Sequence, residues 1–227
     1  MILWLICLIF PMILGFWAQM RVTSAVRKWT QYRASSGVTG AEAARRILFA
    51  ANIHDVEVVQ TDGFLGDHYD PTNKRLCLSP DVYNTPSVAA LGIAAHEVGH
   101  AIQHASHYGM LNLRMQLVPI TQLSSNALPF VILGGFFFHL TGLIMLGVLC
   151  YLVLTVFQLI TLPVEFDASR RAKIILDNMG LVQRGDEFNG VNATLNAAAW
   201  TYVAAFVASL GNLVYLLLRL TSSRSED

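Results

Sequence analysis

The feature that most constrains this chain is a run of 50 consecutive residues, 115–164, without a charged side chain. One helical crossing of a bilayer needs about 20 apolar residues, so this run is too long for one crossing and suits two. The stretch FFFHLTG at 136–142 would form a tight turn between them. The sequence therefore predicts a transmembrane hairpin over 115–161, with crossings near 117–137 and 141–161.

Two further stretches have the length of a crossing. Residues 1–20 carry no charged side chain, and a second apolar run covers 198–219 and ends at Arg219. A signal peptide normally has basic residues before its apolar core, and none stand there. We therefore expect an uncleaved anchor over 1–20, which Pro11 kinks without ending. The run over 198–219 predicts a fourth crossing, with a buried core helix as the alternative.

Composition agrees with this organisation. The chain of 227 residues is 54% hydrophobic and 13% charged, which is roughly half the charged share of an average soluble domain. Its formal net charge of zero gives no argument for a nucleic-acid partner. The three cysteines form no CxxC pair, which argues against a disulfide framework or a cysteine zinc site. We expect a mainly α-helical integral membrane bundle of about four spans, with the lipid bilayer as a partner.

The charged residues gather in two polar segments, 21–114 and 162–197, and a short polar tail follows at 220–227. Two predicted crossings separate the two segments, so both face the same side of the membrane and can contribute to one site. Basic residues follow the first crossing closely and none precede it. Because such residues favour the cytoplasmic side, we expect a cytoplasmic active site in a bacterial cell membrane.

The polar segments predict a small β element and three helices. Residues 56–60 (VEVVQ) and two short stretches around a turn at 70–73 have the composition of strands. A capping box that begins at Thr39 predicts the first helix. Thr85 is the expected cap of the helix that carries most of the histidines. The last helix is expected to open at Glu165.

The histidine-bearing helix contains the pattern H-E-x-x-H at His96, Glu97 and His100. Positions four apart share one face of a helix, so the two imidazoles can hold one ion. Glu97 lies on a neighbouring face, where it can reach a water molecule that the ion activates. This is the arrangement of zinc peptidases, and small residues around it let other elements approach closely. The alternative is a pair of packed core histidines.

The third metal ligand is harder to predict from the sequence. A metzincin would place a glycine and a histidine where this chain has Gln103 and Ser106, so that class is rejected. His104 lies about 12 Å along the helix axis from His96, too far to share an ion with it. Packing, a substrate contact or a contact around the ligands remain open for His104. His107 could be the third metal ligand only if the helix ends before it.

Glu165 is the predicted third ligand, because it directly follows the hairpin on the side that carries the histidines. Its alternative role is that of an acid at a helix N-terminus, which the helix dipole favours. Asp167 is better placed to contact a ligand histidine or an arginine. Asp81 is a further acidic candidate. Asp177 would be the ligand of an intramembrane protease, but basic residues stand just before it.

Four stretches resemble the bacterial YugP-like membrane proteins, a family of neutral zinc metallopeptidases. They are GDHYDPTNKRLCLSPDVY, SVAALGIAAHEVGHAIQHA, LPVEFDASRRA and AAAWTYVAA. The resemblance extends from Gly15 to about Leu217. It implies a membrane-anchored, zincin-like site with peptidase activity.

A more distant resemblance is to the HtpX and CAAX-prenyl membrane proteases, which pair H-E-x-x-H with a later E-x-x-A-D. Laid on EFDAS, that pattern places the ligand at Glu165 and leaves Ser169 where the aspartate would be. The departure puts the aspartate's role in doubt without touching Glu165. Spacing identifies no oxyanion donor; the candidates are Arg170, Arg171, His68 and Tyr202.

We therefore expect a gluzincin-like zinc metalloendopeptidase with Glu97 as general base and His96, His100 and Glu165 as ligands of one Zn²⁺ ion. Its expected substrates are membrane-associated peptides or proteins, in membrane protein quality control. A substrate strand could pair with the hairpin around Leu76–Leu78. The alternative is a non-catalytic, zinc-dependent membrane scaffold or adaptor. A transporter is disfavoured, because no charged or strongly polar pair lies inside the spans.

Overall fold

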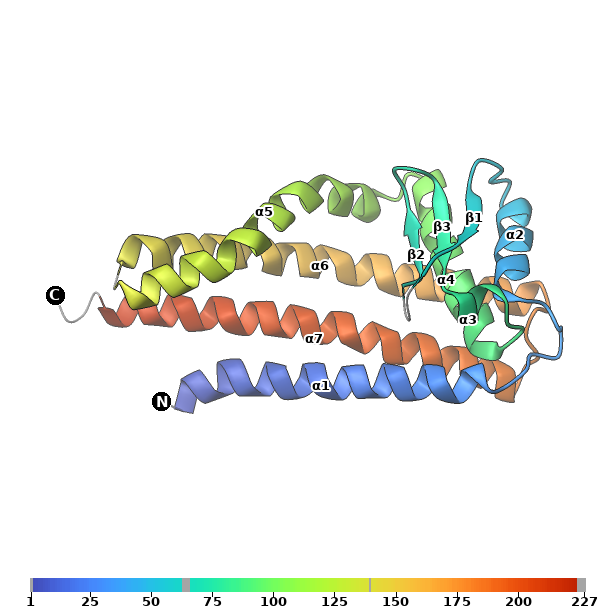
Figure 1. Cartoon of the computed structure of the whole chain (residues 1–227), viewed down its shortest axis with the longest axis horizontal. Coiled ribbons are helices and arrows are strands. Elements are labelled where there is room, and N and C mark those ends of the chain that lie inside the picture. The colour runs from blue at the N-terminus through green and yellow to red at the C-terminus, as the bar shows by residue number, and fades with distance from the viewer. Residues whose placement is uncertain (1, 63–65, 139, 224–227) are drawn as a thin grey trace. The chain divides into compact units, whose positions relative to one another are not determined.

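The computed structural model describes residues 2–62, 66–138 and 140–223 (Figure 1). The chain divides into two compact units. The apolar unit comprises the stretches up to Ala18, from Asn112 to Leu162 and from Thr201 onward. The polar unit comprises Gln19–Leu111 and Pro163–Trp200. The two polar stretches that the uncharged run separates in sequence therefore lie in one unit.

Four helices in the described residues are long and apolar enough to cross a membrane: α1 (Ile2–Thr30), α5 (Gly109–Phe137), α6 (Thr141–Asn178) and α7 (Asp186–Ser223). They expose large apolar side chains, including Leu123, Phe130, Leu133 and Leu149, and a bilayer would cover such surface. The other elements in the described residues are three shorter helices and a three-stranded sheet. The predicted class of a mainly helical membrane protein with a small β element is confirmed.

Small residues allow close helix contacts inside the apolar unit. A Cβ atom added at Gly211 of α7 would lie 2.7 Å from the carbonyl oxygen of Cys7 in α1. One added at Gly135 of α5 would lie 3.3 Å from the backbone nitrogen of Ile144 in α6. Such approach of backbones is typical of helices packed in lipid. Of the turn predicted between α5 and α6, His139 lies outside the described residues.

Helix α6 corrects one expectation about Glu165. The helix runs unbroken from Thr141 to Asn178 with Pro163 inside it, so Glu165 does not open a helix. A proline removes one backbone hydrogen bond and crowds the preceding turn. The residues around the next turn, Val164 and Ala168, are fully buried, and this packing holds the helix together past the proline. The helix-dipole explanation for Glu165 is therefore wrong.

The sheet of the polar unit has the order β1-β3-β2. Strand β1 (Glu57–Gln60) pairs parallel with β3 (Arg75–Leu78), and β2 (His68–Asp70) pairs antiparallel with β3. The strands predicted on either side of the turn at 70–73 are thus present, although residues 63–65 lie outside the described residues. Because β3 is paired on both edges, an added substrate strand would have to pair with the outer edge of β1 or of β2 rather than with β3.

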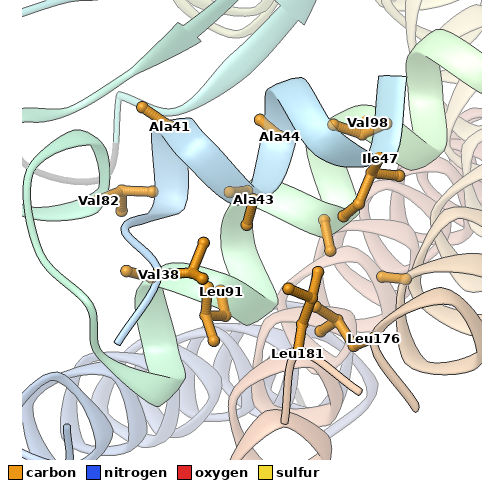
Figure 2. Packing of buried hydrophobic residues seen from close by; sticks show 14 of the residues in the cluster. Val38, Ala41, Ala43, Ala44, Ile47, Val82, Leu91, Val98, Leu176 and Leu181 are labelled. Carbon is orange, nitrogen blue, oxygen red and sulfur yellow. The ribbon is translucent and has the colours of Figure 1, made fainter. Parts of the chain in front are cut away.

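The core of the polar unit lies where α2 (Gly40–Ala50), α4 (Val88–Ala105) and the end of α6 meet (Figure 2). Ile47 of α2, Leu91 and Val98 of α4, and Leu176 of α6 are buried there. Thr39 caps α2 as predicted, because its hydroxyl accepts the Glu42 N–H at 3.3 Å. This core holds the middle of α4 against α6.

Two helix boundaries were predicted with different success. Ser87, not Thr85, caps α4, because its hydroxyl accepts the Ala90 N–H at 3.2 Å. The Thr85 hydroxyl donates to the Asp81 carbonyl instead, and so closes the short helix α3 (Pro80–Tyr83) that precedes α4. At the other end, α6 stops before Gly180, whose φ of +62° suits a glycine.

Candidate metal centre

Helix α4 presents His96 and His100 from adjacent turns. Their ring centroids lie 4.8 Å apart and their planes are nearly perpendicular, at 85°. Between them and before them the helix carries small residues, of which Ala94 and Ala95 are fully buried. The imidazoles therefore stand side by side on a helix whose other faces are packed.

At Gly99 the backbones of α4 and α6 lie close together. A Cβ atom added there would lie 2.8 Å from the carbonyl oxygen of Ala168 and 3.1 Å from its Cα. Any larger residue would collide with the α6 backbone. This contact brings Glu165, one turn before Ala168, to the two histidines of α4.

The three predicted ligands converge. One carboxylate oxygen of Glu165, Oε2, lies 3.2 Å from His96 Nε2 and 3.6 Å from His100 Nε2. The ligand atoms of the three residues all lie within 4.8 Å of one another, and in the described part of the chain this is the one such group. Zinc bonds of 2.0–2.2 Å in a tetrahedral arrangement put neighbouring ligand atoms about 3.4 Å apart. The group therefore fits a zinc ion held by two imidazoles and a carboxylate.

The site is buried, and burial sets its electrostatics. Glu97 is only 8% exposed, and loss of solvent raises the pKa of its carboxyl group, while the neighbouring His96 and His100 oppose that rise. Burial alone would lower the pKa of His100, but the hydrogen bond to Glu165 and the nearby Glu97 carboxylate raise it. Glu97 is thus a carboxyl group that gains a proton more readily than an exposed glutamate.

Ser169 contacts His96 on the side of the ring that is opposite Glu165. Its hydroxyl lies 3.1 Å from His96 Nδ1, the ring nitrogen that does not face Glu165. Ser169 occupies the position where the E-x-x-A-D pattern laid on the sequence would have an aspartate. The sequence pattern identified this position, but the change of residue type hid the contact.

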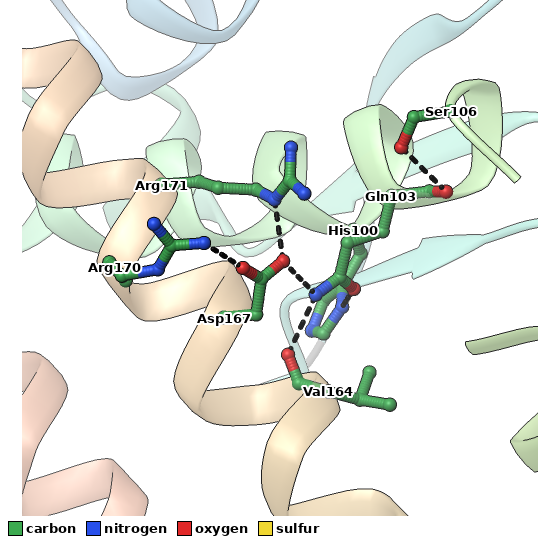
Figure 3. A network of polar contacts seen from close by, with 7 residues as sticks. All are labelled: His100, Gln103, Ser106, Val164, Asp167, Arg170 and Arg171. Atoms are coloured by element: carbon green, nitrogen blue, oxygen red, sulfur yellow. Dashed lines mark hydrogen bonds and ion pairs between the residues drawn. The ribbon is translucent and has the colours of Figure 1, made fainter. Parts of the chain in front are cut away.

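Gln103 contacts the second histidine and was missed as a site residue (Figure 3). Its Oε1 lies 3.0 Å from His100 Nδ1, and its amide nitrogen lies 3.0 Å from Asp167. Asp167 is therefore connected to His100 through an amide. The same carboxylate accepts hydrogen bonds of 2.5 Å from Arg170 and from Arg171. A polar side chain three residues after a predicted ligand histidine was the signal available in the sequence.

His104 lies away from the group of three ligands. The Tyr69 hydroxyl lies 2.9 Å from its Nδ1, and both residues line a cavity of about 230 Å³ together with His107. Burial raises the pKa of Tyr69 to about 12, so this phenol is protonated at neutral pH. Of the contacts left open for His104, the structure therefore places it against Tyr69 and this cavity.

The remaining acidic candidates also lie outside the group. Asp177 accepts two hydrogen bonds of 2.9 Å from the guanidinium of Arg184. Asp81 is exposed on α3. Among the oxyanion candidates, His68 has its Nδ1 within 2.7 Å of the Gly66 carbonyl oxygen. Tyr202 belongs to the apolar unit.

Comparison with known proteins agrees with this geometry. Residues 4–221 match the family described as "Putative neutral zinc metallopeptidase". The chain is 46% identical over 214 residues to "Putative membrane protease YugP" of Bacillus subtilis (strain 168), an alignment that covers 94% of this chain and 95% of that protein. No solved structure is significantly similar to the chain. The chain belongs to the neutral zinc metallopeptidase family that this match defines.

Proposed function

We propose that this protein is a membrane-bound zinc endopeptidase whose metal ligands are His96, His100 and Glu165 and whose general base is Glu97. One observation carries the proposal: two imidazole nitrogens and a buried carboxylate oxygen converge within 4.8 Å, and Glu97 adjoins His96 in the chain. Three protein ligands are the number found in catalytic zinc sites, which leave one position free, whereas structural sites use four.

The proposed chemistry divides between the ion and the protein. Zinc, when bound, supplies a Lewis acid that makes water nucleophilic near neutral pH. The Glu97 carboxylate accepts a proton from the attacking water and later donates it to the leaving amine.

We further propose that the substrates are membrane-associated proteins or peptides, and that cleavage serves membrane protein quality control. The support is the presence of four candidate spans in the same chain and the description of its relative as a membrane protease. From the basic residues behind the first span, we propose that the site faces the cytoplasm.

The test is Glu97→Gln in the full chain, purified in detergent with stoichiometric zinc. The variant should bind one zinc ion as the wild type does, yet lose cleavage of an unfolded protein substrate by at least about 100-fold, the usual size of general-base effects. The matched control is Glu57→Gln, at an exposed glutamate on β1. If Glu97→Gln keeps the biological function while zinc remains necessary, the protein is the zinc-dependent scaffold instead.

A further inference from the structure

Gln103 is a buried polar residue whose side-chain amide can take only one orientation. It is 0% exposed and lies between α4 and α6, one turn after His100 (Figure 3). A buried amide with missing partners would cost about 1–3 kcal/mol, so its pattern of donors and acceptors reports how the site is arranged.

The orientation of the amide follows from its partners on α6. The Gln103 Nε2 lies 2.8 Å from the Val164 carbonyl oxygen and 3.0 Å from Asp167 Oδ2. A carbonyl oxygen and a carboxylate only accept hydrogen bonds, so the NH₂ group must face them. If the amide were turned over, its oxygen would meet two acceptors. The Gln103 Oε1 must therefore face His100.

This orientation fixes the proton on His100. Oε1 is an acceptor, so the nitrogen 3.0 Å away, His100 Nδ1, must carry the hydrogen and donate it. In neutral imidazole, the other nitrogen then has a free lone pair. That nitrogen, Nε2, is the atom that lies 3.6 Å from Glu165 Oε2 in the ligand group.

We propose that Gln103 is a positioning residue that selects the metal-binding tautomer of His100 and sets the distance of that ring from α6. The inference rests on the proposed metal site. Asp167 provides a firm anchor, because Arg170 and Arg171 hold the carboxylate that receives the amide. Ser169 differs at His96, because a hydroxyl can donate or accept and does not dictate a tautomer.

The experiment measures zinc affinity of the full chain in detergent by competition with a chromophoric chelator. Gln103→Met keeps the shape and removes all three hydrogen bonds, so affinity should fall about 10- to 100-fold, as for other residues that orient metal-binding histidines. Gln183→Met, at an exposed glutamine before α7, should leave affinity within about twofold of the wild type. Far-ultraviolet circular dichroism and cooperative unfolding of the metal-free protein show whether each variant is folded. If Gln103→Met is not folded, Gln103→Asn, which keeps a shortened amide, is measured in its place.

A polarity swap separates positioning from packing. In Gln103→Glu the new carboxylate still accepts from His100 Nδ1, but its other oxygen faces the Asp167 carboxylate and the Val164 carbonyl oxygen, so zinc affinity should fall. Adding Asp167→Asn supplies an amide donor opposite the new carboxylate. This second change should raise the zinc affinity of the Gln103→Glu variant at least about tenfold, and it should not raise the zinc affinity of the Gln103→Met variant. Equal zinc affinity of wild type and Gln103→Met, or equal rescue of both variants, overturns the inference. A wild type that binds no zinc would instead refute the proposed function.

Discussion

The close contact at Gly99 makes a sharp prediction, because it links helix packing to metal binding. In Gly99→Ala the new Cβ would stand 2.8 Å from the carbonyl oxygen of Ala168, which belongs to a helix backbone and cannot rotate away. Ordinary contact would require α4 and α6 to separate locally by about 0.6 Å. The two histidines move with α4, while Glu165 moves with α6.

The magnitude differs for stability and for metal binding. Overpacking a tight contact costs about 1–3 kcal/mol, and replacing a helical glycine by alanine returns about 1 kcal/mol. The net loss of stability should therefore be at most about 2 kcal/mol. Zinc sites tolerate ligand displacements of only about 0.2 Å, so a shift of about 0.6 Å should weaken zinc binding at least about tenfold.

The assay is chelator competition together with thermal unfolding of the metal-free protein in detergent. Gly92→Ala is the matched control on the same helix, because its Cβ would lie 3.6 Å from a Val191 side-chain carbon, an ordinary contact. That variant should bind zinc normally and unfold at the same or a higher temperature. If Gly99→Ala bound zinc as tightly as Gly92→Ala, the close approach of α6 would not be what assembles the ligand group.

Two other changes test the site and its surroundings. Glu165→Ala should reduce the zinc content of the purified protein from about one ion per chain to a small fraction, as metal analysis would show. His104→Ala is the control, because His104 lies on the same helix as His96 and His100 but contacts Tyr69, and this variant should keep its zinc. Equal zinc content in the two variants would remove Glu165 from the ligand set. Burial raises the pKa of Asp67 above 3.8, although the hydrogen bonds from Ser79 oppose that rise. The folded state therefore binds the proton of this carboxyl more tightly than the unfolded state does. The stability that this proton contributes is present at low pH and is lost as the pH rises through the raised pKa. Asp67→Asn should therefore gain stability relative to the wild type as pH rises above about 4, measured by chemical unfolding, and a pH-independent difference would contradict this.

Sequence reasoning located the helices and the strands because their signals are local. Absence of charge marked the long apolar helices, and four-residue spacing marked His96 and His100. Continuity of α6 through Pro163 was not predictable in the same way, because it depends on buried packing after the proline. The contact of Gln103 with Asp167 joins residues 64 positions apart, and no local pattern reports it. The predicted domain boundaries stay predictions.

The arrangement of α6 explains why metal binding and folding of the polar unit should be coupled. Glu165, Asp167 and Ser169 lie within five residues of one helix, and they contact His96 and His100, the two proposed ligands, directly or through Gln103. A rotation of α6 would therefore move a ligand and both orienting contacts together. These contacts are complete only when α6 is docked on α4. The free energy of metal binding therefore also stabilises the docking of the two helices. Helix α6, which has the same length as α7 and is longer than the other described helices, thus brings Glu165 to His100, 65 residues away in sequence, and its docking on α4 assembles the proposed site.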